Sequence, residues 1–203
     1  MRKIIVSPFL SLDGVMQASG GPEEDTSSGF TLGGWSVNYR DAAMGEVMGE
    51  NFSTPFDLLL GRRTYDIFAG HWPKVDDETG KAFTACQKYV ATHRPLASDW
   101  ANAQTLGGDV VTRVRALKAG DGLALSVQGS QDFLQTLIAN DLVDEYRLMI
   151  FPLIPGSGRK LFARGSPPAG LKLTKSRTCD TGVLMVWYER AGMASIGSFA
   201  PDQ

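Results

Sequence analysis

The sequence predicts an α/β protein with a mostly parallel sheet and an antiparallel edge. Short, nearly continuous apolar runs alternate along the chain with segments whose apolar residues recur at helical spacing. Continuous runs are typical of strands covered on both faces, and strand–helix repeats favour parallel pairing. The last two runs flank the turn signal Asp180-Thr181-Gly182, which predicts a terminal hairpin.

The composition fits one globular domain. The 203 residues are 43% hydrophobic and 21% charged, with a net charge of -2. That balance argues against disorder and gives no general attraction to nucleic acid or anionic membranes. No apolar run approaches the ~20 residues of a membrane span. We expect a single domain over residues 1–190, followed by a flexible tail over 191–203, which is small and polar.

Cysteine and histidine are too few and too scattered to predict a metal site. Cys86 and Cys179 form no CxxC pattern, and His71 and His93 are the only histidines. Reduced thiols are typical of the cytoplasm, where we expect the protein. The N-terminal MRKIIVSPFLSLDG begins like a signal peptide, but a serine and a proline interrupt its apolar run. We interpret it as a first strand.

The first half of the chain predicts three strands, two helices and a long loop. Residues 17–35 are rich in glycine, serine and acids, and long ordered loops of this kind often carry function. Met44, Val47 and Met48 give the segment after this loop one apolar face, which favours a helix. The predicted strands are 3–9, 56–60 and 88–92, and the predicted helices are 38–51 and 62–69.

The second half continues the alternation. Asp109 is a good N-cap for a helix over 110–118. Gly129-Ser130 opens another helix, whose apolar stripe consists of Phe133, Leu134, Leu137 and Ile138. The predicted strands are a short one near 103–106, then 123–127, 143–151, 171–178 and 183–189.

The stretch LLLGRRTYDIF (58–68) favours an anion site at the end of a strand, which is where ligands bind in open α/β sheets. Gly61 lets the backbone approach a ligand closely, and the first turn of the next helix offers unpaired N–H groups. Arg62, Arg63 and Thr64 add donors. Arginines at a positive helix N-terminus are unfavourable alone, so a phosphate is favoured. The alternative is that both arginines reach solvent.

Three other strand ends carry weaker signals. Leu12-Asp13-Gly14 contains a plain turn signal. Thr92-His93-Arg94 either meets a second phosphate, such as a ribose 2′-phosphate, or forms a solvated loop. Gly129, followed by Ser130-Gln131-Asp132, either exposes N–H groups to an anion or forms a tight turn. Two glycine-opened helix starts fit a dinucleotide, although the Rossmann GxGxxG fingerprint is absent.

Five segments together resemble the dihydrofolate reductase-like superfamily, and more closely its riboflavin-biosynthesis reductase branch, the RibD C-terminal-like family. The resemblance covers roughly residues 2–190. Its most telling part is a strand with Asp-Glu, followed by Pro-Gly-x-Gly and Leu-Phe. The segments are SLDGVM (11–16), LLLGRRTYDIF (58–68), KYVATHR (88–94), VQGSQDFLQTLI (127–138) and LVDEYRLMIFPLIPGSGRKLF (142–162).

The resemblance implies a central mixed sheet of about eight strands, a homodimer, and an NADPH-dependent reductase. Many members have two glycines where this chain has Gly129-Ser130. By the family pattern, the cofactor phosphates bind to Gly61, Arg62, Arg63 and Thr64, and the adenosine 2′-phosphate lies near Thr92, His93 and Arg94. The pyrophosphate binds to Gly129, Ser130, Gln131 and Asp132. The nicotinamide is lined by Ser7, Leu12, Asp13 and Gly14.

The implied substrate is a pteridine- or pyrimidine-type heterocycle. Asp41, which follows Trp35 after the long loop, matches the position of the acid that folate reductases keep on their first helix. The alternative is a first-turn acid favoured by the helix dipole. Arg159 and Lys160 either bind a substrate phosphate or lie in a solvated loop. The usual zinc deaminase domain is absent from this sequence, so riboflavin-pathway membership does not follow. The alternative function is a module that binds NADP(H) without turnover.

Overall fold

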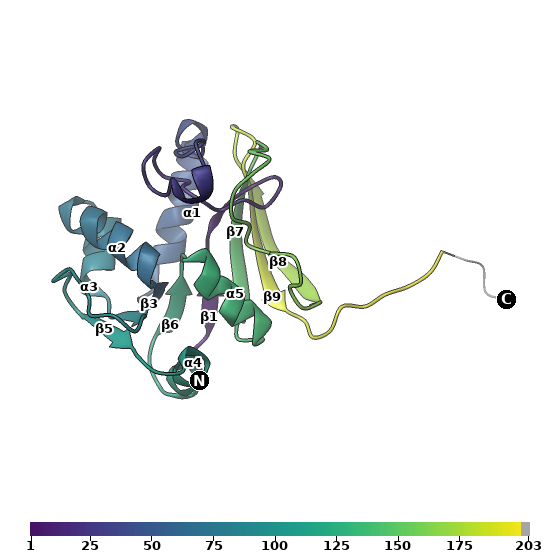
Figure 1. The fold of residues 1–203 in the computed structure, drawn as a ribbon. Coiled ribbons are helices and arrows are strands. Elements are labelled where there is room, and N and C mark those ends of the chain that lie inside the picture. The colour runs from purple at the N-terminus through teal and green to yellow at the C-terminus, as the bar shows by residue number, and fades with distance from the viewer. Residues whose placement is uncertain (200–203) are drawn as a thin grey trace.

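The structure, a computed structural model, describes residues 1–199 (Figure 1). The strands are Ile4–Val6 (β1), Phe9–Ser11 (β2), Phe56–Gly61 (β3), Lys88–Ala91 (β4), Ala103–Leu106 (β5), Ala124–Val127 (β6), Glu145–Phe151 (β7), Leu171–Thr178 (β8) and Leu184–Arg190 (β9). The α-helices are Ala42–Ser53 (α1), Arg62–His71 (α2), Glu78–Ala85 (α3), Val110–Ala119 (α4) and Gln131–Ala139 (α5). Short 3₁₀ helices cover Ser27–Gly29, Val37–Tyr39 and Trp72–Lys74.

Within the described residues, nine strands form one sheet in the order β5-β4-β3-β6-β1-β7-β9-β8, and β2 pairs with β7 beside this path. The pairs from β5 to β7 are parallel, whereas β9 is antiparallel to both β7 and β8. The predicted mostly parallel sheet and terminal hairpin are therefore confirmed. The predicted first strand over 3–9 is wrong in one respect. It divides into β1 and β2 around Ser7-Pro8, because proline has no N–H to donate to a strand ladder.

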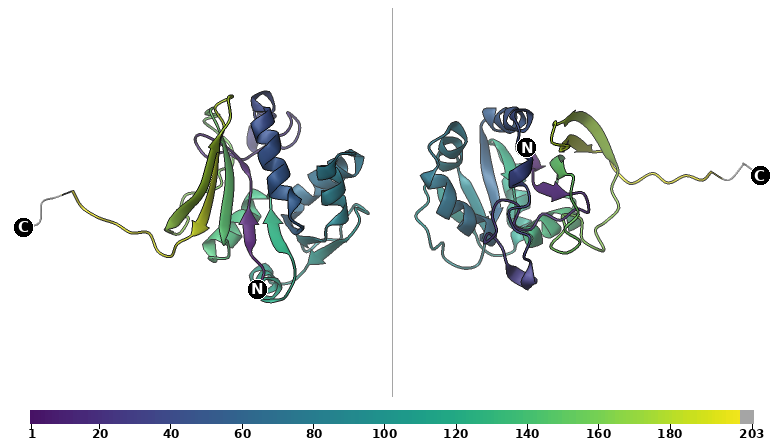
Figure 2. Two further views of the ribbon diagram at one scale, coloured as in Figure 1. Left: turned by 180° about the vertical axis from the view of Figure 1, so that it is seen from behind. Right: turned by 90° about the horizontal axis from the view of Figure 1, so that it is seen from above.

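Helices cover both faces of the sheet, and β3 shows how its sequence allows this. Leu58, Leu59 and Leu60 have no exposed surface. Leu59 packs in the cluster that contains the apolar stripe of α5, while Leu58 and Leu60 pack in another cluster with Tyr65 of α2 and Phe83 of α3. Successive strand side chains point to opposite faces, so a strand between two helical layers is apolar throughout. Figure 2 shows α1 and α5 on opposite sides of the sheet.

Capping residues fix the starts of α1 and α4. The predicted helix over 38–51 begins instead at Ala42, because Asp41 accepts a hydrogen bond from Met44 N at 2.8 Å and so forms its N-cap. Asp109 caps α4 as predicted, with a 2.8 Å hydrogen bond from Thr112 N. Helix α3 was missing from the sequence prediction. It is short and contains Gly80, which weakens helix propensity.

The C-terminal hairpin lies at one edge of the sheet, and residues 194–199 lead away from the body of the molecule (Figures 1 and 2). The predicted flexibility of 191–203 stays a prediction, and its last four residues lie outside the described part. No helix among residues 1–199 has the length and apolar character needed to cross a membrane.

A buried ion pair ties three neighbouring strands together at the end of the sheet opposite the loops described below. Arg2 pairs with Asp57 of β3, and its Nε donates to Leu123 O, just before β6, at 2.6 Å. The side chain of Arg2 is 3% exposed and that of Asp57 is 12% exposed. Removing one partner from such a pair leaves an uncompensated buried charge.

We therefore expect Asp57→Ala to lower the free energy of unfolding by about 3–5 kcal/mol. Glu50→Ala is the control, because Glu50 pairs with Lys175 on the surface at 2.6 Å. Loss of that exposed pair should cost about 0–1 kcal/mol. Urea denaturation of both variants measures the difference, and equal losses would contradict the interpretation.

Candidate functional site

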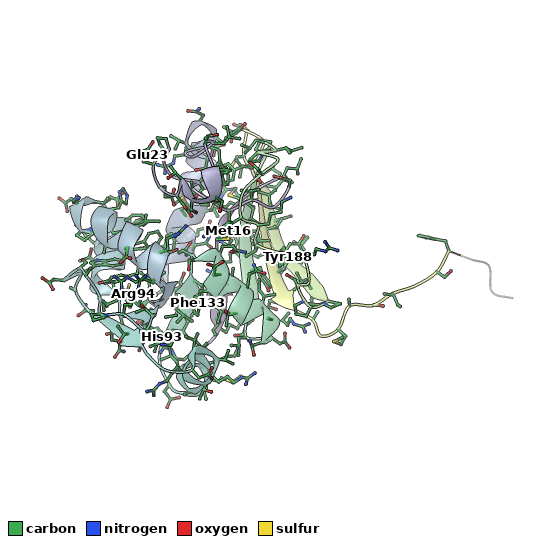
Figure 3. The ribbon with its side chains drawn as sticks, viewed as in Figure 1. Met16, Glu23, His93, Arg94, Phe133 and Tyr188 are labelled. Carbon is green, nitrogen blue, oxygen red and sulfur yellow. The ribbon has the colours of Figure 1, made fainter. Side chains whose placement is uncertain are left out.

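Two adjoining cavities lie over the carboxyl ends of the parallel strands, with volumes of about 550 and 790 Å³. The first is bounded by the β1–β2 link, residues 16–25, α1, α2 and β7, and the second by the starts of α2, α4 and α5. Figure 3 labels Met16 from the first cavity, Arg94 and Phe133 from the second, and Glu23 from the shared wall. That wall consists of Glu23, Glu24, Asp25, Arg63, Ile67 and Ser130.

Aromatic and thioether side chains dominate the apolar lining of the first cavity. They are Phe9, Met16, Met48, Phe52, Phe68, Trp72, Phe83 and Met149. Trp72 Nε1 is buried and has no hydrogen-bond partner among residues 1–199. The aromatic rings of this wall fit a planar ligand that stacks on them.

The polar lining of the first cavity comes from several elements, among them residues 17–25, α2, the start of α5 and β7. Arg147 Nε donates to Glu145 Oε1 at 2.7 Å, and its Nη1 lies 3.4 Å from Asn51 Oδ1. Arg40, at the rim, is exposed, and its guanidinium has no ion pair or hydrogen bond within residues 1–199. His71 also lines the cavity. The cavity therefore offers both fixed and free positive groups beside its aromatic wall.

The second cavity lies where two helices begin side by side. Gly61 N donates to Gly129 O at 3.0 Å, which joins the turn before α2 to the turn before α5. A Cβ at Gly61 would overlap Ser130 Oγ, and one at Gly129 would come within 2.5 Å of Thr64 Oγ1. Neither helix has a side-chain N-cap hydrogen bond. The free N–H groups of two helix starts thus face one region, as an anion site requires.

Both arginines of α2 have acceptors within the protein. Arg62 Nε donates to both carboxylate oxygens of Asp66 at 2.8 Å, and its Nη1 donates to Pro95 O at 2.7 Å. Arg63 Nη1 lies 2.7 Å from both carboxylate oxygens of Asp25 and 2.8 Å from Ser27 Oγ. The side chain of Arg63 also reaches solvent, since it is 44% exposed. The immediate anions of both arginines are side-chain carboxylates.

The predicted residues after β4 divide between a turn and the second cavity. Thr92 is buried, and its Oγ1 accepts a hydrogen bond from Arg94 N at 3.1 Å. Arg94 lines the second cavity, and its guanidinium has no partner within the described chain. His93 is exposed. Among the three, Arg94 is the group available to an anion.

Most of the predicted cofactor residues meet at the two cavities, and some do not. Those on a cavity wall are Ser7, Gly61, Arg62, Arg63, Thr64, Arg94, Ser130, Gln131 and Asp132. Within residues 1–199, those outside both linings are Leu12, Asp13, Gly14, Thr92, His93 and Gly129. Leu12-Asp13-Gly14 forms a turn in which Asp13 Oδ1 accepts from Ser11 Oγ at 2.6 Å and Asp13 Oδ2 lies 3.4 Å from Lys160 Nζ.

The two substrate-side residues predicted from the sequence also lie outside the described linings. Trp35 is buried, donates from Nε1 to Gln17 O at 2.8 Å and meets Phe151 edge-on. Asp41 is the α1 cap, and the hydrogen bond from Met44 N lowers the pKa of its carboxyl. An acid with a lowered pKa is a poor proton donor at neutral pH. The catalytic role of Asp41 stays a prediction.

Two acids of the long loop were missed by the sequence reasoning. Burial raises the pKa of Glu24, whose Oε2 accepts hydrogen bonds from Gly20 N at 2.5 Å and Gly21 N at 3.2 Å. Burial opposes ionisation of Asp25 as well, but hydrogen bonds from Ser27 and Arg63 hold the pKa of Asp25 below its usual value. The acidic composition of the loop was visible, but the orientation of each acid depends on tertiary contacts.

The sheet topology defines a fold class, that of the dihydrofolate reductase-like α/β proteins, and here two cavities lie at the carboxyl ends of the parallel strands. Within that class, the chain belongs to the RibD C-terminal domain family, whose model matches residues 2–185. The resemblance inferred from the five sequence segments is thereby confirmed.

Relatives cover nearly the whole chain. In Bacillus subtilis (strain 168), the uncharacterized protein YyaP is 27% identical over 197 residues, covering 94% of this chain and 96% of that protein. The uncharacterized protein YwjB of the same strain is 24% identical over 199 residues, covering 94% and 99%. Neither relative carries a described activity.

Two crystal structures share the fold. A putative riboflavin biosynthesis protein from Shewanella sp. PV-4 superposes with a TM-score of 0.66 at 18% identity, covering 93% of this chain and 99% of that one. A pyrimidine reductase-like protein from Corynebacterium diphtheriae has a TM-score of 0.59 at 12% identity, covering 94% and 92%. At these identities the likeness concerns the fold.

The contact between the two helix starts has a testable cost. Gly61→Ala places a methyl group against Ser130, so the turns must separate, and we expect a loss of about 1–3 kcal/mol of stability. Gly49→Ala in α1 is the control, because a Cβ there meets no atom within 4 Å and alanine favours a helix. Denaturant midpoints compare the two. A neutral Gly61→Ala would mean that the turns are not tightly packed.

Proposed function

We propose that the protein is an NADPH-dependent reductase that transfers a hydride to a pteridine- or pyrimidine-type heterocycle. The observation that carries this proposal is the pair of adjoining cavities that meet at two uncapped helix starts. One cavity has the donors for phosphates, and the other has an aromatic wall for planar rings. Membership of the RibD C-terminal domain family supports the same class of reaction.

The residues present fit the diphosphate and adenosine parts of the cofactor. Gly61-Arg62-Arg63-Thr64 and Gly129-Ser130-Gln131-Asp132 supply N–H groups and hydroxyls at the cavity junction. Arg94 supplies a guanidinium without an internal partner beside them, as an adenosine 2′-phosphate requires. We assign Thr92 and His93 to the turn that presents Arg94.

The first cavity fits the reacting rings. When bound, NADPH supplies the hydride, and the protein supplies orientation, a dry surface and a proton. Ser7 and Gln128 line this cavity at the ends of β1 and β6, where a nicotinamide would lie near the sheet. The aromatic wall from α1, α2 and α3 holds the second ring and excludes water. Leu12, Asp13 and Gly14 act on the nicotinamide only indirectly in this proposal, by shaping the turn after β2.

Glu24 is the acid best suited to donate the proton. Three acids line the first cavity: hydrogen bonds from Ser27 and Arg63 hold the pKa of Asp25 below its usual value, and Glu23 is exposed. Glu24 is half-buried and has a raised pKa, so it keeps its proton to a higher pH than an ordinary glutamic acid. In the proposed reaction it protonates the nitrogen or oxygen atom next to the carbon that receives the hydride.

NADPH binding tests the proposal. We expect NADPH to quench tryptophan fluorescence, because Trp72 lines the first cavity, and to raise the melting temperature. Failure of both would overturn the cofactor assignment. Binding without oxidation by any pteridine, pyrimidine or aldehyde in a panel would favour the alternative, an NADP(H)-binding module without turnover.

Arg94→Gln should weaken NADPH binding about 10- to 100-fold and leave NADH binding nearly unchanged, because a charged hydrogen bond to the 2′-phosphate is lost. Arg115→Gln is the matched control, since Arg115 is an exposed arginine on α4 outside both linings as described. Fluorescence titrations with both cofactors measure the ratio. Equal weakening of NADPH and NADH would contradict a 2′-phosphate contact.

Glu24→Gln should slow hydride transfer about 100-fold or more while leaving the dissociation constant for NADPH unchanged. In the wild type the proton donor is lost as pH rises through the raised pKa of Glu24, so the single-turnover rate should fall over that range. The glutamine variant should lack this pH dependence. Glu23→Gln, which alters the exposed neighbouring acid, is the control. Wild-type rates and pH dependence in Glu24→Gln would assign the proton to another group.

A further inference from the structure

We propose that Arg63 and Arg159 form a phosphate-binding pair at the junction of the two cavities, and that Asp25 fills the place of the phosphate until a ligand arrives. This inference deepens the proposed function, on which its identification of the natural ligand rests. It adds that the Asp25 carboxylate competes with a phosphate for Arg63 and Arg159. Phosphate binding is thereby connected to the long loop over the first cavity.

The carboxylate of Asp25 occupies a position suited to an anion. Its two oxygens each lie 2.7 Å from Arg63 Nη1, and Oδ2 lies 3.9 Å from Arg159 Nη1. Oδ1 also accepts from Ser27 N at 3.0 Å and from the Ser27 hydroxyl. The carboxylate is 11% exposed, whereas Arg63 is 44% exposed. The cationic side of the contact is therefore open to a second anion.

Gln17 links the backbone at Arg159 to the backbone at Asp25 and Ser27, and it does not contact the Asp25 carboxylate. It is 5% exposed, and its Oε1 accepts a hydrogen bond from Arg159 N at 3.1 Å. Its Nε2 donates to the backbone oxygens of Asp25 at 3.1 Å and Ser27 at 3.0 Å. Removal of the carboxylate should thus leave the backbone frame and both guanidinium groups in place.

Within the group of Arg63, Arg159 and Asp25, the charges favour exchange of the carboxylate for a phosphate. Arg63 and Arg159 share one carboxylate, so the group of three keeps an excess positive charge. A diphosphate has more negative charge and more acceptor oxygens than a carboxylate, and it also reaches the free N–H groups at the start of α2. Its binding must displace Asp25, and with it a contact that holds the 17–35 loop.

The experiment is calorimetric titration of the full chain with inorganic pyrophosphate. We expect Asp25→Asn to bind about tenfold tighter than the wild type, because the internal competitor loses its charge, and Arg159→Gln to bind about tenfold more weakly. Asp121→Asn and Arg164→Gln change the same charges at exposed positions outside the described linings. These controls should stay within about twofold of the wild type.

Two outcomes overturn the proposal: Asp25→Asn binds pyrophosphate no tighter than Asp121→Asn, or Arg159→Gln binds it as well as Arg164→Gln. If Asp25→Asn does not fold, by circular dichroism and thermal melting, the Arg159→Gln comparison decides. Repeating the titration with saturating NADPH separates two sources of the phosphate. Competition identifies the diphosphate of the cofactor, and unchanged binding identifies a phosphate on the second substrate.

The experiments distinguish a failure of the proposed function from a failure of the phosphate pair. Tighter pyrophosphate binding by Asp25→Asn without any NADPH binding would support the phosphate pair and overturn the NADPH-dependent reductase. NADPH binding with no difference in pyrophosphate affinity between Asp25→Asn and Asp121→Asn would support NADPH binding and overturn the phosphate pair.

Discussion

The contact between the turns after β3 and β6 determines where the rest of the site lies. These strands are neighbours in the sheet, and Gly61 and Gly129 let their following turns meet without side chains between them. As a result α2 and α5 begin next to each other with their N–H groups directed to one region. Both cavities border this junction, with phosphate-type donors on one side and aromatic rings on the other.

The long loop completes the site from the opposite direction. Arginines at a helix N-terminus carry the same sign as the helix dipole, so their position needs a compensating anion. Asp66 provides it for Arg62 from the next turn of the same helix, and Asp25 provides it for Arg63 from the loop. Each arginine of α2 thus meets an anion, and that anion is internal to the protein. In the proposed site, an external phosphate would compete with the carboxylate of Asp25.

The sequence predicted most of the sheet and about half of the site, and the division has a physical cause. Strands such as β3 and β5, the cap Asp109 and the α5 stripe depend on local patterns, and they agree with the structure within one or two residues. The anion-facing turns also follow local rules, since glycine before a helix exposes N–H groups wherever the sheet places it. Glu24 and Asp25 depend instead on how a 19-residue loop folds over α2, which no local pattern specifies.

The same distinction between local and tertiary determinants applies to the two cavities. The second cavity is bounded largely by strand ends and helix starts, whose positions follow from sheet pairing. Most of the aromatic and thioether wall of the first cavity lies outside the sheet, on α1, α2, the 3₁₀ helix at Trp72, α3 and Met16, while Phe9 of β2 and Met149 of β7 complete it. Changes in Asn51 or Phe52 therefore reshape the second-ring position without disturbing the junction at Gly61 and Gly129. Under the proposed function, cofactor binding depends mainly on the strand ends and helix starts, and substrate choice depends mainly on the helix faces and residues 16–25.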